Sequence, residues 1–347
     1  MNPVATPSIQ IDVRVSQRSE RSLAEDVLDG LTRPFKELPP KHFYDARGSE
    51  LFERICELPE YYPTRAERRI LEDRADEIVA AVVPVELVEL GSGTADKTHV
   101  LLDAMRRADV LERYIPVDVS ESTLRACAER LCERYPGLAV HGVVGDIERH
   151  LSAIPEGGPR VVAFLGGTIG NFTPGSRRRF LRRVGRLLGA DDRLLLGTDL
   201  VKDAHVLEAA YNDSAGVTAE FNRNMLVVLN RELGSEFDPQ DFDHVAFFDP
   251  HHQWVEMRLR ARHAHEVDIP GIDLRVRFGA REELRTEISA KFTRDRLETD
   301  LGAAGLALEH FYTDPQELFA LSLAGPSAAI RRGGRAAAGS AGARARR

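Results

Sequence analysis

The sequence predicts an α/β fold in which a parallel β-sheet is covered by helices and a second unit is inserted. Strand-like and helix-like segments alternate from Val85 to Asp199, which is typical of a parallel sheet with helices on its faces. The apolar run Val85–Leu90 enters Gly91-Ser92-Gly93, as a buried strand does where the backbone approaches a ligand. After Asp199 an antiparallel pattern replaces the alternation, which resumes near Thr293.

The predicted strands and helices follow one another with short connections. The strands of the first part are Val85–Leu90, Tyr114–Val119, Leu138–Val144, Val161–Leu165 and Arg193–Gly197. The helices between them are Lys97–Arg107, Glu121–Arg134 and Arg177–Leu188, and a later helix over Thr293–Ala304 precedes the final strands Leu306–Tyr312 and Leu318–Leu323. Ligands bind beyond the carboxyl ends of parallel strands. The candidate residues at those ends are Gly91, Asp118, Asp146, Gly166 and Asn171.

An antiparallel hairpin marks the inserted unit. Trp254–Val267 alternates apolar and charged residues, Pro270-Gly271 is a turn signal, and Ile272–Phe278 alternates again. We therefore expect residues 201–290 to form a second domain together with residues 21–64, and residues 65–200 plus 291–324 to form the sheet domain. Residues 1–20 are expected to be a flexible leader and residues 325–347 a disordered tail, because neither contains an apolar stripe.

The composition argues against several classes of protein. Of the 347 residues, 43% are hydrophobic and 29% are charged, and the formal net charge is -8. This acidic balance argues against a nucleic-acid-binding protein, and no apolar run reaches the roughly 18–20 residues of a membrane span. The N-terminus lacks a basic segment followed by an apolar core, so we expect no secretory signal.

The cysteines and histidines predict neither disulfides nor a metal site. Cys56, Cys127 and Cys132 are odd in number and lack C-x-x-C spacing, which fits reduced thiols in a cytoplasm. The pairs His251-His252 and His263/His265 have no carboxylate or cysteine constellation that would complete a ligand set. We therefore expect a cytoplasmic protein that binds no metal.

The glycine-rich turn alone leaves the nucleotide open. A dinucleotide site prefers G-x-G-x-x-G, and Asp96 stands at the third glycine position, which weakens the case for NAD. Asp118 lies where an acidic side chain binds ribose hydroxyls, which fits NAD or S-adenosylmethionine, and Asp146 suits an adenine amino group. As alternatives, Asp118 and Asp146 are helix N-caps and Lys97 is a solvated helix residue.

Five segments taken together resemble one family. They are PPKHFYDARGSELFERICELPEYYPTRAE, ELGSGTADKT, VDVS, FLGGTIGNF and TEISAKF. From about Arg21 to Ala324, in this order, the chain resembles the histidine Nα-methyltransferases of ergothioneine biosynthesis, which belong to the S-adenosylmethionine-dependent amino-acid N-methyltransferases. The resemblance implies a seven-stranded, Rossmann-like methyltransferase core whose last strand is antiparallel, with an inserted α+β substrate-binding domain.

The resemblance also implies the residues of the site. For the cofactor S-adenosylmethionine these are Tyr61, Gly91, Lys97, Asp118, Asp146 and Ile147. Ile147 stands where part of the family has an aromatic residue. For the substrate they are Tyr44, Phe52, Gly166, Asn171, Tyr211, Thr218, Met257, Glu287 and Ser289.

The implied substrate residues have a coherent chemistry. Asn171 and Tyr44 are the expected catalytic residues, because their oxygens can accept hydrogen bonds from an α-amino group. Tyr211 can donate to the α-carboxylate. Glu287 and Ser289 are two residues apart in an alternating segment, so both can face the two nitrogens of an imidazole.

The predicted function is Nα-trimethylation of free L-histidine to its betaine, hercynine, in three transfers. Direct displacement requires alignment of the two reactants and an amine without its extra proton, and it needs no metal. One alternative is methylation of another amino acid such as tryptophan or tyrosine, against which the carboxylate of Glu287 argues. The other is a non-catalytic binding module, against which the intact glycine turn argues. We expect a monomer that acts on a small molecule, without an obligate protein partner, nucleic acid or membrane.

Overall fold

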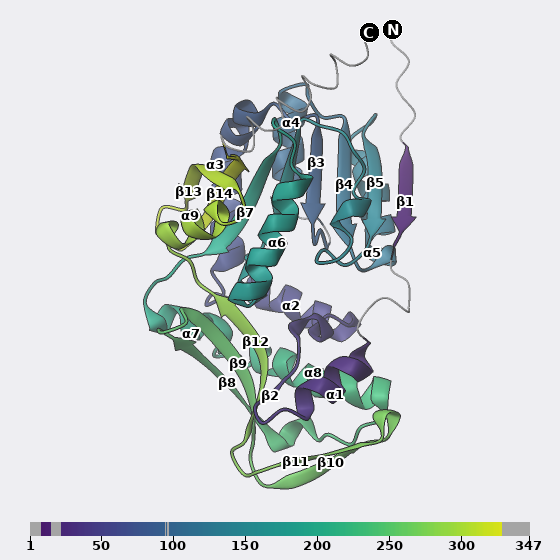
Figure 1. Cartoon of the computed structure of the whole chain (residues 1–347), viewed down its shortest axis with the longest axis vertical. Coiled ribbons are helices and arrows are strands. Elements are labelled where there is room, and N and C mark those ends of the chain that lie inside the picture. The colour runs from purple at the N-terminus through teal and green to yellow at the C-terminus, as the bar shows by residue number, and fades with distance from the viewer. Residues whose placement is uncertain (1–7, 15–21, 94, 96, 328–347) are drawn as a thin grey trace, which may run out of the picture.

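The structure, a computed structural model, describes residues 8–14, 22–93, 95 and 97–327. Two units lie one above the other along the long axis of the molecule (Figure 1). The upper unit contains a large sheet covered by helices, and the lower unit contains a smaller sheet and several helices. Asp96, which weakened the case for NAD, lies outside the described residues, as do residues 1–7 of the expected leader and 328–347 of the expected tail.

The large sheet has the strand order β1-β5-β4-β3-β6-β7-β14-β13. Its strands are β1 (Ile9–Val13), β3 (Glu86–Leu90), β4 (Arg113–Asp118), β5 (Ala139–Val144), β6 (Arg160–Phe164), β7 (Arg193–Asp199), β13 (Leu306–Thr313) and β14 (Phe319–Pro326). Strand β14 pairs antiparallel with β7 and with β13, whereas the other pairs are parallel. Seven of these eight strands form the predicted core with an antiparallel last strand, and β1 adds an eighth strand beside β5.

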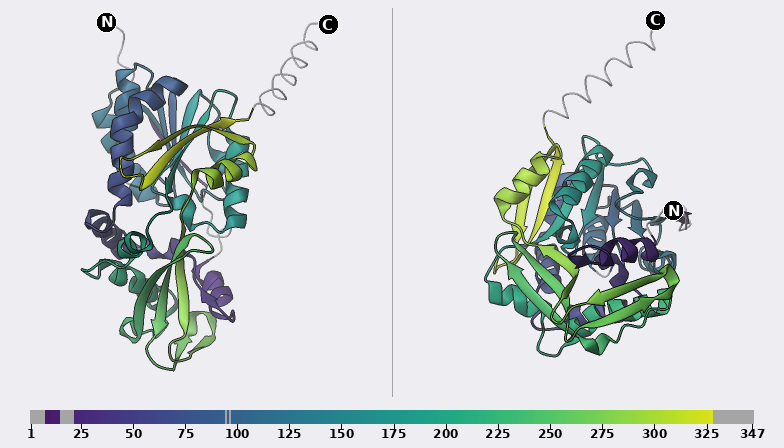
Figure 2. Two further views of the ribbon diagram at one scale, coloured as in Figure 1. Left: turned by 90° about the vertical axis from the view of Figure 1, so that its left-hand side faces the viewer. Right: turned by 60° about the horizontal axis from the view of Figure 1, so that its bottom comes forward.

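Helices cover both faces of this sheet, as Figure 2 shows from two further directions. They are α3 (Pro63–Val82), α4 (His99–Arg107), α5 (Glu121–Arg134), α6 (Pro174–Leu187) and α9 (Arg294–Gly302). Alternate residues of one strand enter different cores: Leu87 packs with residues of α3, α4 and α5, while Val88 packs with residues of α6 and α9. Both faces of this strand are therefore buried, and burial on both faces favours apolar residues at successive positions.

The lower unit combines the inserted segment with the N-terminal one. Its helices are α1 (Leu23–Leu31), α2 (Ala46–Glu57), α7 (Ala204–Tyr211) and α8 (Val217–Leu233). Its strands are β2 (Lys36–Glu37), β8 (Phe242–Asp249), β9 (Trp254–Ala261), β10 (His265–Ile269), β11 (Leu274–Phe278) and β12 (Glu283–Ala290). Strand β2 pairs with β12 in the sheet β2-β12-β9-β8. Val27 and Leu51 share one hydrophobic core with Leu229 and Leu259.

Three local predictions were wrong. Trp254–Val267 is not one strand, because β9 ends at Ala261 and pairs with β8 and β12, while β10 pairs with β11. Alternation specifies which side chains face inward but not which strand becomes the partner. Ile9–Val13 of the expected leader forms β1 beside β5, where main-chain pairing orders it. Gly325 and Pro326 of the expected tail belong to β14.

Among the described residues, no helix is both long enough and apolar enough to cross a membrane.

Candidate active site

The turn after β3 leaves its backbone open to a ligand. The arrowheads of the parallel strands point toward the lower unit (Figure 1). Gly91 and Gly93 have φ angles of 70° and 49°, in the left-handed region that favours glycine. Apart from the glycines themselves and their chain neighbours, no atom of the described residues lies within 4 Å of the position that a Cβ would take at either glycine. A ligand can therefore approach the main chain closely at this turn.

Asp118 joins this turn to the end of β4. Its carboxylate accepts hydrogen bonds from the N–H groups of Gly93 and Ser120, both at 3.0 Å. The N-cap of α5 is Ser120, whose hydroxyl accepts from the Thr123 N–H, so the alternative that Asp118 is a helix N-cap is wrong. A carboxylate has about four lone-pair sites, which leaves capacity for the hydroxyls of a ribose.

Asp146 and Ile147 form the turn that follows β5. The Asp146 carboxylate accepts from the Glu148 N–H at 2.6 Å, and the Asp146 N–H donates to Nδ1 of His150 at 2.9 Å. The short helix after this turn begins at Leu151 with His150 as its N-cap. The alternative that Asp146 is a helix N-cap is therefore wrong as well. Ile147 is half-buried against the core of the upper unit.

Lys97 is held by a buried carboxylate that we did not predict as a site residue. Helix α4 begins at His99, so Lys97 lies in the turn before it and is not a solvated helix residue. Its ammonium group pairs with Glu67 of α3, which is fully buried. Burial acts to lower the pKa of Lys97, but the charge of Glu67 raises it above its usual value. Glu67 also accepts from the Gly166 N–H at 2.7 Å.

Four aromatic side chains form a continuous wall in the lower unit. The ring of Phe52 lies 5.6 Å from Tyr44 and 6.2 Å from Tyr61, and Tyr61 lies 6.4 Å from Tyr211, between ring centroids. Tyr44 is 49% exposed. The hydroxyls of Tyr44 and Tyr61 have no hydrogen-bond partner in the part of the chain that the structure describes. They are therefore available to a ligand.

Strand β12 presents polar groups next to this wall. Tyr211 donates a hydrogen bond to Ser289 at 2.8 Å, and this bond occupies the donor that we expected to bind the α-carboxylate. Met257 is the register partner of Glu287 on β9, so their side chains lie on the same face of the sheet. Burial raises the pKa of Glu287 to about 7. Within the described ranges the Glu287 carboxylate has no hydrogen-bond or ion-pair partner.

The segment after β6 brings Gly166 and Asn171 to the junction of the two units. A Cβ on Gly166 would lie 3.8 Å from Nζ of Lys97. A Cβ on Gly170 would lie 2.8 Å from the carbonyl oxygen of Ala290 in β12, so this segment packs directly against the strand that carries Glu287. The Asn171 amide makes no side-chain hydrogen bond to the residues described.

Thr218 is a buried residue of α8. It occupies the first turn of α8, where its N–H donates to Asp213 at 2.7 Å, and its side chain is buried. Phe221, one turn further along α8, contacts Tyr44 at a centroid distance of 5.9 Å. Thr218 thus lies on the helix that also carries Phe221.

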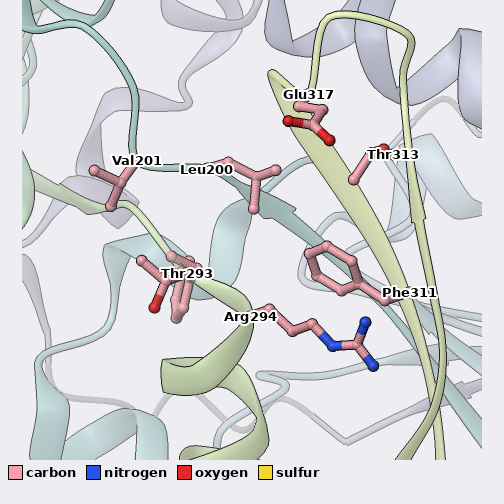
Figure 3. Close-up of a pocket in the computed structure, with 8 residues that line it drawn as sticks. Leu200, Val201, Thr293, Arg294, Phe311, Thr313 and Glu317 are labelled. Atoms are coloured by element: carbon pink, nitrogen blue, oxygen red, sulfur yellow. The ribbon is translucent and has the colours of Figure 1, made fainter.

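Two other features lie apart from these residues. A cavity of about 220 Å³ contains none of the predicted site residues (Figure 3). It is lined by Leu200, Val201, Phe292, Thr293, Arg294, Phe311, Thr313 and Glu317.

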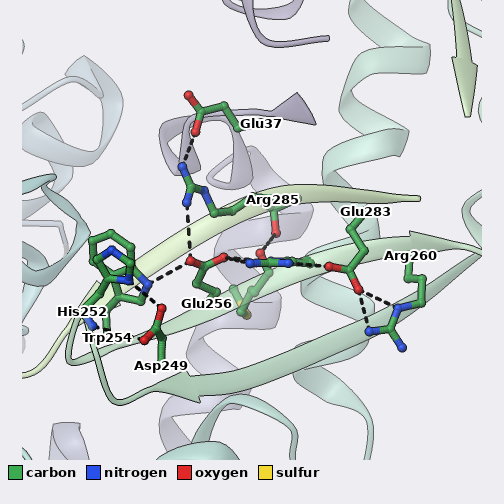
Figure 4. A network of polar contacts seen from close by, with 11 residues as sticks. Glu37, Asp249, His252, Trp254, Glu256, Arg260, Glu283 and Arg285 are labelled. Carbon is green, nitrogen blue, oxygen red and sulfur yellow. Dashed lines mark hydrogen bonds and ion pairs between the residues drawn. The ribbon is translucent and has the colours of Figure 1, made fainter. Parts of the chain in front are cut away.

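His252 stacks on Trp254 and pairs with Asp249 beside a charged network on the smaller sheet (Figure 4). Throughout the described ranges, no three His, Cys, Asp or Glu side chains group as a metal site would require.

Comparison with known proteins identifies the family. A family model described as "Histidine-specific methyltransferase, SAM-dependent" matches residues 23–326. The chain belongs to this family. It is 52% identical over 303 residues to a histidine N-alpha-methyltransferase of Mycolicibacterium smegmatis, and 50% identical over 303 residues to one of Mycobacterium tuberculosis. Both alignments cover 87% of this chain and 94% of the relative. Ergothioneine biosynthesis protein 1 of Schizosaccharomyces pombe is 31% identical over 225 residues, which are 61% of this chain and 29% of that protein.

The protein is therefore an S-adenosylmethionine-dependent methyltransferase, and its residues fit this methyl donor. The open backbone at Gly91 and Gly93 and the spare acceptor capacity of Asp118 are features that a nucleoside ligand requires. Two charged residues next to the site, Glu67 and Lys291, were not predicted from the sequence. Both lie inside the quoted motifs PTRAE and TEISAKF, yet nothing in the local sequence shows that either charged side chain is buried.

Proposed function

We propose that this methyltransferase converts L-histidine to hercynine in three methyl transfers to its α-amino nitrogen, within ergothioneine biosynthesis. The observation that carries the proposal is that Glu287 and Ser289 lie side by side on one face of the same strand. An unpaired carboxylate and a hydroxyl stand where two ring nitrogens need one partner each. Family membership and two histidine N-alpha-methyltransferases at 50% and 52% identity support the choice of substrate.

The cofactor contacts come from the carboxyl ends of the strands. Gly91 and Lys97 would hold the methionine region, Asp118 the ribose hydroxyls, and Asp146 with Ile147 the adenine, with Tyr61 nearby. When bound, S-adenosylmethionine supplies an electrophilic methyl group on a positively charged sulfur. A Cβ on Gly166 would lie 3.8 Å from Nζ of Lys97, and the same segment carries Asn171, so we assign Gly166 to the border of both ligands.

The amine has two acceptors that the protein leaves unpaired. The amide oxygen of Asn171 and the hydroxyl of Tyr44 accept its N–H groups and thereby aim the nitrogen lone pair at the methyl carbon. Burial and the negative charge of Glu287 raise the pKa of Tyr44, so its hydroxyl stays neutral. Because Tyr44 is 49% exposed, a proton released by the amine can pass to solvent along it. The quaternary product has no nitrogen lone pair, so turnover ends there.

The donor for the α-carboxylate is reassigned. The Tyr211 hydroxyl already donates a hydrogen bond to Ser289. The hydroxyl of Tyr61, its neighbour in the aromatic wall, has no hydrogen-bond partner among the residues described. Burial raises the pKa of Tyr61 well above its usual value, so it keeps its proton and donates it. We therefore assign Tyr61 and the N–H groups of the Asn171 amide to the carboxylate.

Mass analysis of free amino acids incubated with S-adenosylmethionine tests the proposed function. L-histidine is expected to gain three methyl groups, and tryptophan and tyrosine few or none. Glu287→Ala is expected to lower kcat/KM for histidine by about 100-fold, with S-adenosylhomocysteine bound as tightly as before. Glu266→Ala, an exposed glutamate on the β10 strand, is the matched control. Histidine that gains no mass, or that loses nothing with Glu287→Ala, contradicts the proposal.

A further inference from the structure

Lys291 is a buried cation directly behind the substrate residues. It is fully buried, at 0% exposure. Glu287, Ser289 and Lys291 are spaced two apart along β12 and its continuation, so they share one side of the chain. Nζ of Lys291 lies 2.8 Å from Asp199, 2.9 Å from the Tyr211 hydroxyl and 2.9 Å from the Ser289 hydroxyl.

These contacts use every hydrogen that the ammonium group has. An ammonium group has three N–H donors and no acceptor, and Asp199, Tyr211 and Ser289 take one each. The Tyr211 hydroxyl accepts a hydrogen bond from Lys291 and donates one to the Ser289 hydroxyl. In this series of hydrogen bonds, it is therefore defined which partner each hydroxyl accepts from and which it donates to.

The direction of these hydrogen bonds decides whether Ser289 can donate to a ligand or accept from it. A hydroxyl has two acceptor sites and one donor. Both acceptor sites of Ser289 are taken, one by Lys291 and one by Tyr211, and its own proton has no acceptor within the described part of the protein. Ser289 can thus donate to a ligand but cannot accept from it.

We propose that Lys291 is a positioning residue that makes Ser289 a fixed hydrogen-bond donor and thereby restricts the substrate ring to one with an acceptor nitrogen at that point. This inference rests on the proposed function. Glu287 then takes the N–H on the other side of the ring. The site accepts the neutral imidazole in one tautomer and rejects the imidazolium ion, which would bring a second N–H toward a group without a free lone pair.

Two ring analogues separate this role from general support of the fold. Thiazolylalanine keeps an acceptor nitrogen and has no N–H, whereas pyrrolylalanine has an N–H and no acceptor nitrogen. Each is tested in the ring isomer that binds better, as a substrate or as a competitive inhibitor of histidine methylation. Lys291→Met is compared with Lys202→Met. The side chain of Lys202 is only 9% exposed and pairs with Asp199, but its other side-chain contact is Tyr62.

With Lys291→Met, kcat/KM for histidine and the affinity for thiazolylalanine are expected to fall about 10- to 100-fold. Pyrrolylalanine, which never had the acceptor, should change by less than about two-fold, and so should S-adenosylhomocysteine. Lys202→Met should lower the unfolding temperature without changing the ratio between the two analogues. An equal loss for all three ring ligands with Lys291→Met overturns the inference.

Ser289→Ala gives the same test if Lys291→Met does not fold. It removes the donor itself, so it should reproduce the selectivity: a loss for histidine and thiazolylalanine and none for pyrrolylalanine. A loss for pyrrolylalanine as large as that for histidine would also overturn the role of Lys291. Wild-type protein that leaves histidine unmethylated would instead refute the proposed function, so the two failures are distinguishable.

Discussion

The carboxylate of Glu67 accepts a hydrogen bond of 2.7 Å from the backbone N–H of Gly166. Through its other oxygen the same side chain pairs with Lys97. Glu67 belongs to α3, Lys97 follows the glycine turn after β3, and Gly166 follows β6. One buried carboxylate therefore fixes the relative positions of two strand ends where the cofactor and the substrate are proposed to meet.

Glu67→Gln is expected to weaken both cofactor binding and the fold. The amide oxygen can still accept from Gly166, but Lys97 loses its counter-charge. The free energy of unfolding should fall by about 1–3 kcal/mol and the affinity for S-adenosylhomocysteine by about 10-fold. Denaturant unfolding and calorimetric titration measure the two effects. Glu72→Gln, on the exposed side of the same helix, should change neither, and unchanged affinity with Glu67→Gln would show that this carboxylate does not shape the site.

Asp118→Asn tests the assignment of the ribose contact. The substitution keeps the size of the side chain but turns one acceptor oxygen into a donor, which faces the N–H of Gly93 or Ser120. We expect the affinity for S-adenosylhomocysteine to fall at least about 10-fold. Asp191→Asn, at an exposed position before β7, serves as the control. Equal affinities for the two variants would remove Asp118 from the cofactor site.

The parallel strands could be predicted from the sequence because each is a short segment made mostly of apolar residues. Strand β3 was expected at Val85–Leu90 and occupies Glu86–Leu90, and helix α5 occupies its predicted span, Glu121–Arg134. A strand that is buried on both faces is rich in apolar residues, and this composition can be seen in the sequence. Strand β8 (Phe242–Asp249) was not predicted, because its apolar residues do not alternate regularly.

The polar support of the site could not be predicted in the same way. Glu67 looks like a residue of a solvated helix face until its contact with Gly166, 99 positions away, is known. Lys291 follows a strand, and only the fold brings Asp199 and Tyr211 to it. Local sequence indicates which side chains are apolar, but which buried charges meet depends on tertiary packing.

Glu256→Ala should destabilise the lower unit without reaching the site. Glu256 is almost fully buried and accepts from the Trp254 indole at 2.9 Å and from Arg258 at 2.6 Å (Figure 4). Its side chain points to the opposite face of the sheet from its neighbour Met257. Removing it leaves donors unpaired, and the free energy of unfolding should fall by about 2–4 kcal/mol. Histidine kcat/KM measured well below the unfolding temperature should stay within about two-fold; a large loss would mean that this network positions the site.

The pH dependence of stability should reveal the carboxylate of Glu287. Its pKa is raised from 4.5 to about 7 by burial, against the opposing charge of Lys291. An acid whose pKa is raised in the folded state contributes stability that is complete below its unfolded pKa, and this stability is lost as the pH rises through the folded value. For the ligand-free protein the loss should therefore develop between pH 4.5 and about 7.

Glu287→Gln isolates this contribution, because glutamine does not titrate. Its advantage over the wild type in free energy of unfolding should grow through that pH window and level off above it, at no more than about 3 kcal/mol. Parallel denaturant titrations of both proteins at a series of pH values measure the difference, in which the titration of all other shared groups cancels. A difference that is flat with pH would mean that Glu287 is ionised as easily in the folded protein as in the unfolded chain. The carboxylate would then not be the desolvated partner that a neutral imidazole requires.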